Sequence, residues 1–261
     1  MSKTSSSSRW ADLDFPQRET RLEAVGVKFM AGGTHISRTM MLQEIGMLLR
    51  ASAPETSAVA YANAVVVGNV LGKATESTRK KSLRHLRELY GLAPELPIFR
   101  VFRQFRDVDV AAEPLLALLC AWTRDPLLRA TTPPVFSAAP GEPVSSFALA
   151  DAVADGFPDR YSLLNQRKIG RNAAATWTQS GHLHGHTKKV RARVDARPAA
   201  VAFALWLGSV AGFAGEALLT SPWCRLLDLT AEQARNRAGE AHRHGLLNLR
   251  AAGSVVEITF P

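Results

Sequence analysis

The sequence predicts a mainly α protein, assembled from helix-turn-helix or winged-helix units with short β-hairpin wings. Apolar residues recur at helical spacing through most of the chain, which favours helices over strands. Glycine and proline divide these segments into short helices in close succession, the order that a helix-turn-helix requires. Twice, at 182–194 and at 246–260, a helical segment is followed by the period-two alternation of a β-hairpin.

The composition narrows the expected function. The 261 residues are 46% hydrophobic, enough for a substantial core, and 32 Lys and Arg against 23 Asp and Glu give a net charge of +9. Such a surplus favours a polyanionic partner, although it can also serve solubility alone. Cys120 and Cys224 lie far apart without neighbouring ligands, so neither a disulfide framework nor a zinc ribbon is indicated. We expect a cytoplasmic protein without a cofactor.

Four regions are expected along the chain. Residues 1–27 are interpreted as a flexible N-terminal tail and arm without the apolar core of a signal peptide, with a short arm or helix over residues 10–27. Residues 28–130 are interpreted as a helical helix-turn-helix domain. Residues 131–143, rich in Pro, Ala and Gly, are predicted to be a linker, and residues 144–261 to form one or two winged-helix-like domains. The apolar stretch at 199–215 is too short to cross a bilayer as a helix, so we expect it in the core.

Residues 69–91 are predicted to be the recognition helix of the first domain, with its lead-in turn. Gly72 supplies the turn, Thr75 or Ser77 caps the helix, and leucines with Tyr90 form a buried stripe. The opposite face is expected to be solvent-exposed and cationic, with hydroxyl groups at the N-terminal end of the helix. Its residues are Thr75, Ser77, Thr78, Arg79, Lys80, Lys81, Arg84, His85 and Arg87. This composition suits the major groove, and a solvated helix of an ordinary bundle is the alternative.

Further helices are expected on both sides of this one. Ser37 is predicted to cap a helix, and a second helix follows over 56–71. At 95–106, three phenylalanines alternate with three arginines, so we expect the rings in the core and the guanidinium groups on the other side. Apolar helices are predicted over 111–123 and from 125.

The second domain is expected to follow the winged-helix order. Helices over 145–154 and 162–180 precede the hairpin at 182–194. The second helix offers polar side chains that suit base edges, namely Asn165, Gln166, Arg167, Lys168, Arg171 and Asn172. The hairpin carries a basic edge formed by Lys188, Lys189, Arg191 and Arg193. A closing helix from Thr230 and its hairpin carry more glutamate, which favours a packing or partner surface.

Several stretches resemble the BrxA family of bacterial BREX phage-defence systems. They are Gly32-Gly33, NVLGKATESTRKKSLRHLRELYGL at 69–92, LLALLCAWTRDPLL at 115–128 and the closing hairpin. The resemblance implies an all-helical protein with winged-helix-like units that binds double-stranded DNA without catalysis. It is strongest over the first half, and the basic hairpin at 182–194 is an addition. It assigns DNA contact to Thr75, Ser77, Thr78, Arg79, Lys80, Lys81 and Arg84.

No catalytic constellation is evident in the sequence. A strand would place His182, His184 and His186 on one side, where they could ligate a metal, but Gly185 interrupts it and imidazoles on a wing can simply meet phosphates. The carboxylates are dispersed, and no P-loop, Gly-x-Ser-x-Gly or Rossmann fingerprint is present.

We therefore expect a non-enzymatic, double-stranded DNA-binding accessory protein of a BREX-like system, with other defence subunits as possible partners. The alternatives are a protein-interaction scaffold of such a complex and a winged-helix transcriptional regulator. Phosphate contacts are expected from Lys80, Lys81, Arg87, Lys188, Lys189, Arg191 and Arg193. Groove contacts are expected from Thr75, Ser77, Thr78, Arg79, Asn165, Gln166 and Arg171.

Overall fold

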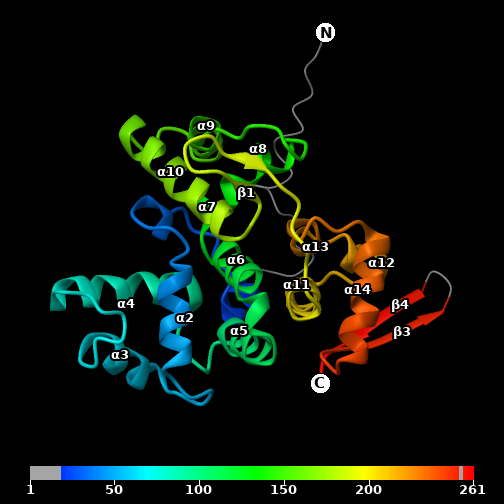
Figure 1. Ribbon diagram of the computed structural model, residues 1–261. Coiled ribbons are helices and arrows are strands. Elements are labelled where there is room, and N and C mark those ends of the chain that lie inside the picture. Colours follow the sequence, from blue (N-terminus) through cyan, green and yellow to red (C-terminus); the bar gives the residue numbers. More distant parts are fainter. Residues whose placement is uncertain (1–18, 253–254) are drawn as a thin grey trace, which may run out of the picture.

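The structure is a computed structural model that describes residues 19–252 and 255–261. It is mainly helical with two small antiparallel sheets of two strands each, which confirms the predicted fold class (Figure 1). The first half contains α1 (Glu19–Val25), η2 (Thr34–Ile36), α2 (Leu42–Arg50), α3 (Ala58–Val66), α4 (Glu76–Tyr90), α5 (Pro97–Val108), η3 (Val110–Ala112), α6 (Glu113–Arg124), α7 (Pro126–Ala130) and α8 (Thr132–Phe136). The second half contains α9 (Ser146–Gly156), α10 (Leu163–Gln179), β1 (Leu183–His184), β2 (Val190–Arg191), α11 (Pro198–Val210), α12 (Gly215–Leu219), α13 (Pro222–Leu226), α14 (Ala231–Arg243), β3 (Asn248–Ala252) and β4 (Val255–Thr259).

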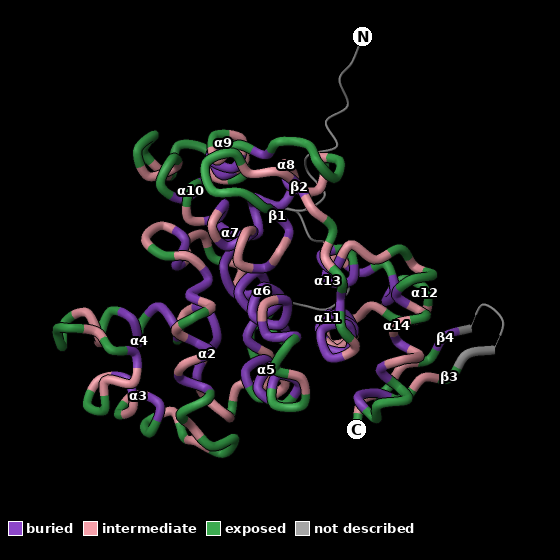
Figure 2. The backbone as a smooth tube through the Cα atoms, viewed as in Figure 1, coloured by how far each residue is buried: buried purple, intermediate pink, exposed green. Residues whose placement is uncertain are grey.

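One continuous core joins the two halves of the chain. Nearly every residue of α6 is buried, as are the seven consecutive residues 199–205 of α11, and Figure 2 shows both helices near the centre, largely in the purple of buried residues. α11 packs against α5 and α6 of the first half and against α13 and α14 of the second. The rings of Phe102 and Phe203 meet across this junction with centroids 6.3 Å apart. The apolar stretch at 199–215 is thus a core helix, and no described helix has the length and apolarity to cross a membrane.

The predicted arm at 1–27 is partly a folded element. Residues 1–18 lie outside the described part, but residues 19–25 form α1, and the side chain of Leu22 is fully buried in the core. A short helix, one of the two alternatives expected for residues 10–27, is therefore present at 19–25. An isolated helix of seven residues is marginal in water, so the buried leucine is what holds α1 in place.

The segment at 131–143 is not the free linker that its composition predicts. Its first half forms α8, and Thr131, Thr132 and Val135 are fully buried. Trp122 Nε1 donates a hydrogen bond to Thr132 Oγ1 (2.8 Å), and Trp177 Nε1 donates one to Thr131 Oγ1 (2.9 Å). A buried indole N–H needs an acceptor, and proline is tolerated in the first turn of a helix, so the same residues that resemble a linker serve as core and helix start.

α2 begins later than expected. Ser37 does not cap it, because Met41 adopts a left-handed conformation (φ 54°) directly before the helix. The preceding backbone is held from another element, since Met40 N donates to Thr176 Oγ1 on α10 (2.8 Å). Residues 34–36 form the separate turn η2. A long-range contact, which the local sequence does not encode, therefore sets the start of α2.

The aromatic face of α5 packs as predicted, but its basic face does not. Phe99, Phe102 and Phe105 are buried. Two of the three arginines are buried as well, since Arg103 Nε donates to Asp107 (2.6 Å) and Arg106 Nε donates to Glu113 (2.7 Å). The expectation that the guanidinium groups lie on the side of the helix away from the core is therefore wrong for these two residues.

Candidate nucleic-acid interface

The exposed face of α10 carries three cations without an acidic partner. Ser162 caps the helix by accepting a hydrogen bond from Asn165 N (3.4 Å). Arg167, Lys168 and Arg171 are exposed, and none of them forms an ion pair with a carboxylate in residues 19–252 and 255–261. Their charge is therefore available to an anion from outside the chain.

α10 is held tightly against α9 by a glycine. A Cβ at Gly170 would lie 2.3 Å from Ser146 O and 2.9 Å from Ala150 N, both backbone atoms of α9. Only glycine permits this approach, so Gly170 is a packing glycine. The two helices form the helix-turn-helix that the sequence predicts, with α10 as its second helix.

A small sheet follows α10 in the position of a wing. β1 and β2 pair antiparallel, with Leu183 opposite Arg191. Residues before α9 extend this sheet, because Gly141 N donates to Arg191 O (2.8 Å) and Val144 N donates to Lys189 O (2.9 Å). A winged helix has this order: an extended segment, two helices and a hairpin. Here they are residues 141–144, α9, α10 and the pair β1 and β2, and the extended segment lies beside β2. The wing presents exposed Lys188 and Arg193, and half-buried Lys189.

Arg191 is not part of this charged surface, and its predicted DNA contact is wrong. The residue is buried, its guanidinium is paired with the carboxylate of Asp228, and it lies over the ring of Phe136 at 4.8 Å. Its position opposite buried Leu183 turns it inward, because side chains opposite each other in a two-stranded sheet share one face. Arg191 therefore anchors the hairpin to the loop before α14.

The three histidines of the hairpin do not share a face. His182 is fully buried and lies between Ser180 Oγ and Leu226 O, each within 2.9 Å of a ring nitrogen, whereas His184 and His186 are exposed. Burial lowers the pKa of His182 to about 4. Within the described residues, no three His, Cys, Asp or Glu side chains gather as they would around a metal ion.

α4 also presents a cationic surface, although part of its charge is paired. Thr75 caps it by accepting from Thr78 N (3.2 Å), as predicted. Lys80 pairs with Glu76 (2.6 Å), and Arg84 lies 3.9 Å from Glu88. Glu76, Ser77, Lys80, Lys81 and Arg84 line one shallow depression. Arg87 is exposed, and Thr78 and Arg79 are half-buried.

His85 was expected on the wet face of α4 and is instead buried. Its ring lies 3.4 Å from both Ser37 Oγ and Glu88 Oε2. Burial lowers the pKa of His85 and outweighs Glu88, whose hydrogen bond and charge raise it; the charges of Arg84 and Arg38 also lower this pKa. Arg38 is exposed, and its charge acts on His85 of α4, so it lies near this helix in a loop where no periodic pattern marks it.

η2 connects the two cationic helices. Thr34 Oγ1 donates to Glu88 of α4 (2.8 Å), and Asn172 Nδ2 of α10 donates to His35 O (2.8 Å). Figure 1 shows α4 and α10 on the same side of the view, with this dark blue segment between them. Asn172 is therefore used within the fold, as is the amide of Gln166, which donates to Tyr161 O (2.9 Å).

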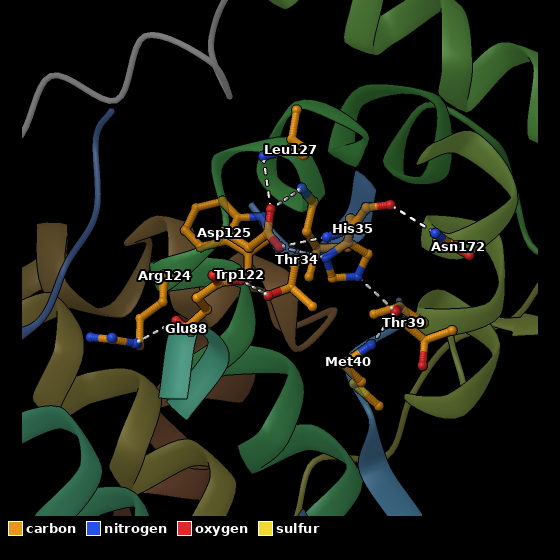
Figure 3. A network of polar contacts seen from close by, with 12 residues as sticks. Thr34, His35, Thr39, Met40, Glu88, Trp122, Arg124, Asp125, Leu127 and Asn172 are labelled. Atoms are coloured by element: carbon orange, nitrogen blue, oxygen red, sulfur yellow. Dashed lines mark hydrogen bonds and ion pairs between the residues drawn. The ribbon is translucent and has the colours of Figure 1, made fainter. Parts of the chain in front are cut away.

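A buried polar network fixes η2 in this position (Figure 3). His35 Nδ1 lies 2.8 Å from Asp125 Oδ2, and His35 Nε2 lies 2.8 Å from Thr176 Oγ1. Although burial opposes the charge of Asp125, His35 holds the pKa of this carboxyl below its usual value. The order Asp, His, hydroxyl resembles a nucleophilic triad, but all three residues are buried and Thr176 Oγ1 already accepts from Met40 N. The network holds α10 to the core.

The closing unit differs from the first two in its charge pairing. Thr230 and Gln233 form a capping box at the start of α14. Arg235 is paired with Glu216, and Arg237 pairs with both Asp195 (2.8 Å) and Glu240 (2.9 Å). α14, β3 and β4 lie on the side of the molecule opposite α4 and α10 (Figure 1).

No protein-family model matches the sequence, and no curated protein matches it significantly.

Proposed function

We propose that the protein binds double-stranded DNA through α10, its wing and α4. The observation that supports this most directly is the set of three exposed, unpaired cations on α10, the second helix of a winged-helix arrangement. The N-terminal part of such a helix contacts base edges in the major groove, and flanking cations contact phosphates. Lys188 and Arg193 on the wing and Lys81 on α4 add exposed positive charge.

The test compares two variants with the same loss of charge. In the first, Arg167, Lys168 and Arg171 are changed to Gln; in the control, the exposed Arg50, Arg100 and Arg243 are changed to Gln. Duplex affinity is measured by fluorescence anisotropy at several salt concentrations. We expect the first variant to bind at least tenfold more weakly and to lose up to about 2.7 from the salt slope, at about 0.9 per phosphate contact.

Two results would contradict the proposal. The first is absence of salt-dependent duplex binding by the native chain. The second is an equal loss of affinity in both variants, since this would mean that net charge, and not the α10 surface, drives association. Circular dichroism of each variant establishes that the helices are retained.

The resemblance to the BrxA family extends this proposal to a cellular role. We propose a non-catalytic accessory protein of a BREX-like phage-defence system, in which other subunits carry out the chemistry. Co-purification with the products of neighbouring genes tests this role, and a chain that copurifies with none of them and leaves phage resistance unchanged on deletion would contradict it.

A protein-interaction surface on the α14 side is the second candidate function. The paired arginines of this unit leave it less free positive charge than α10 has, which is more compatible with a protein partner than with DNA. Arg243→Glu is then expected to weaken a subunit contact without changing duplex affinity.

A further inference from the structure

The exposed end of α10 carries apolar side chains that the fold does not use. Leu163 and Leu164 are 63% and 74% exposed, and Phe147 at the start of α9 is 61% exposed. α10 is attached to the core by other residues, since Ile169, Ala173 and Trp177 are fully buried. Within residues 19–252 and 255–261, nothing covers these two adjacent leucines at the first positions of the helix, so their apolar surface is available to a partner.

The cations described above surround this apolar end. Leu164, Lys168 and Arg171 follow one another at helical spacing and so lie along one stripe of α10. Leu163 lies one turn before Arg167, whose guanidinium carbon is 5.7 Å from the ring centre of Phe147. The complementary surface of a partner must therefore be strongly anionic and must also present small apolar groups next to its charges.

Duplex DNA presents both features in the major groove. The C5 methyl group of thymine is the apolar group on that edge, it lies beside the phosphate backbone, and apolar side chains recognise it. The first residues of a recognition helix are the ones that reach base edges. Resting on the proposed DNA binding, we infer that Leu163 and Leu164 contact thymine methyl groups and give the protein a preference for thymine-containing major grooves.

The inference predicts sensitivity to a single methyl group on the DNA. The probes are two A·T-rich duplexes of 20 base pairs that differ only by deoxyuridine in place of thymidine. Loss of one contacted methyl is expected to weaken binding about fourfold, and loss of two about fifteenfold. A G·C-rich duplex with 5-methylcytosine should bind more tightly than its unmethylated counterpart, because the added methyl occupies the same edge of the groove.

Two double variants, each measured with the thymidine and the deoxyuridine duplex, test whether the leucines make the methyl contacts. Leu163→Ala with Leu164→Ala should bind the thymidine and deoxyuridine duplexes with nearly equal affinity. The control is Val59→Ala with Val67→Ala, two valines that are 69% and 77% exposed on and beside α3, and it should keep the native ratio. Because all four side chains are exposed, loss of folding is not expected, and thermal melting verifies this.

The outcomes separate this inference from the function on which it depends. Salt-dependent duplex binding with the same thymidine-to-deoxyuridine ratio in the native chain and the leucine variant overturns the inference and leaves DNA binding intact. Absence of duplex binding by the native chain overturns both. A leucine variant that binds both duplexes like the native chain but loses self-association in sedimentation also overturns it, since the occupant is then a second copy.

Discussion

The buried hydroxyl of Thr176 is the point at which the position of α10 can be tested. It bonds to His35 Nε2 and to Met40 N, each at 2.8 Å. In Thr176→Val the volume is nearly kept, so no cavity forms, but a buried backbone N–H and a buried imidazole nitrogen both lose their partner. At about 1–3 kcal/mol for each unsatisfied group, we expect unfolding free energy to fall by about 2–6 kcal/mol.

The matched control is Thr178→Val, the same chemical change on the same helix. Thr178 Oγ1 donates only to Ala174 O of its own helix (2.7 Å), and its side chain is half-buried, so the expected cost is below about 1 kcal/mol. Urea denaturation at pH 7.5, followed by circular dichroism, measures both values. If the two variants unfold at the same urea concentration, the hydrogen bonds of Thr176 do not contribute the stability that we assign to them.

Three further predictions concern buried groups. The contribution of His182 to the unfolding free energy should be fully present above the unfolded pKa of about 6.5 and be lost as pH falls toward 4, because the unfolded chain then protonates the imidazole while burial holds its folded pKa at about 4; equal acid destabilisation of His182→Gln would contradict this. Arg191→Met should cost about 3–5 kcal/mol by leaving its carboxylate partner unpaired, whereas Arg193→Met should lower duplex affinity and leave the melting temperature unchanged. Cys120 and Cys224, whose pKa values burial raises to about 12, should react with a thiol reagent only after unfolding in urea.

The local sequence determined the helices, and it determined where a helix starts wherever a side-chain oxygen accepts a hydrogen bond from a backbone N–H of the first turn. The caps at Thr75, one of two predicted candidates, and at Thr230 are present, because an N-cap bond spans only three residues and depends on nothing else. The apolar stripes were equally predictable, since helical periodicity decides which face is buried. The two hairpins followed from alternation.

What the sequence did not determine is which charged and polar residues turn inward. Arg191, Arg103 and His85 have the composition of a solvent-facing surface, yet each is buried beside a carboxylate, and for Arg191 that carboxylate lies 37 residues away. Only the tertiary structure brings Arg191 to Asp228, because an ion pair depends on distance in space. Arg103 and His85 have their carboxylates three or four residues further along the same helix, so for them the tertiary structure decides only that the pair is buried. No local pattern in the sequence marks Thr176. Its hydroxyl nevertheless contacts Met40 and His35, far away in the chain, and so sets both the start of α2 and the position of α10.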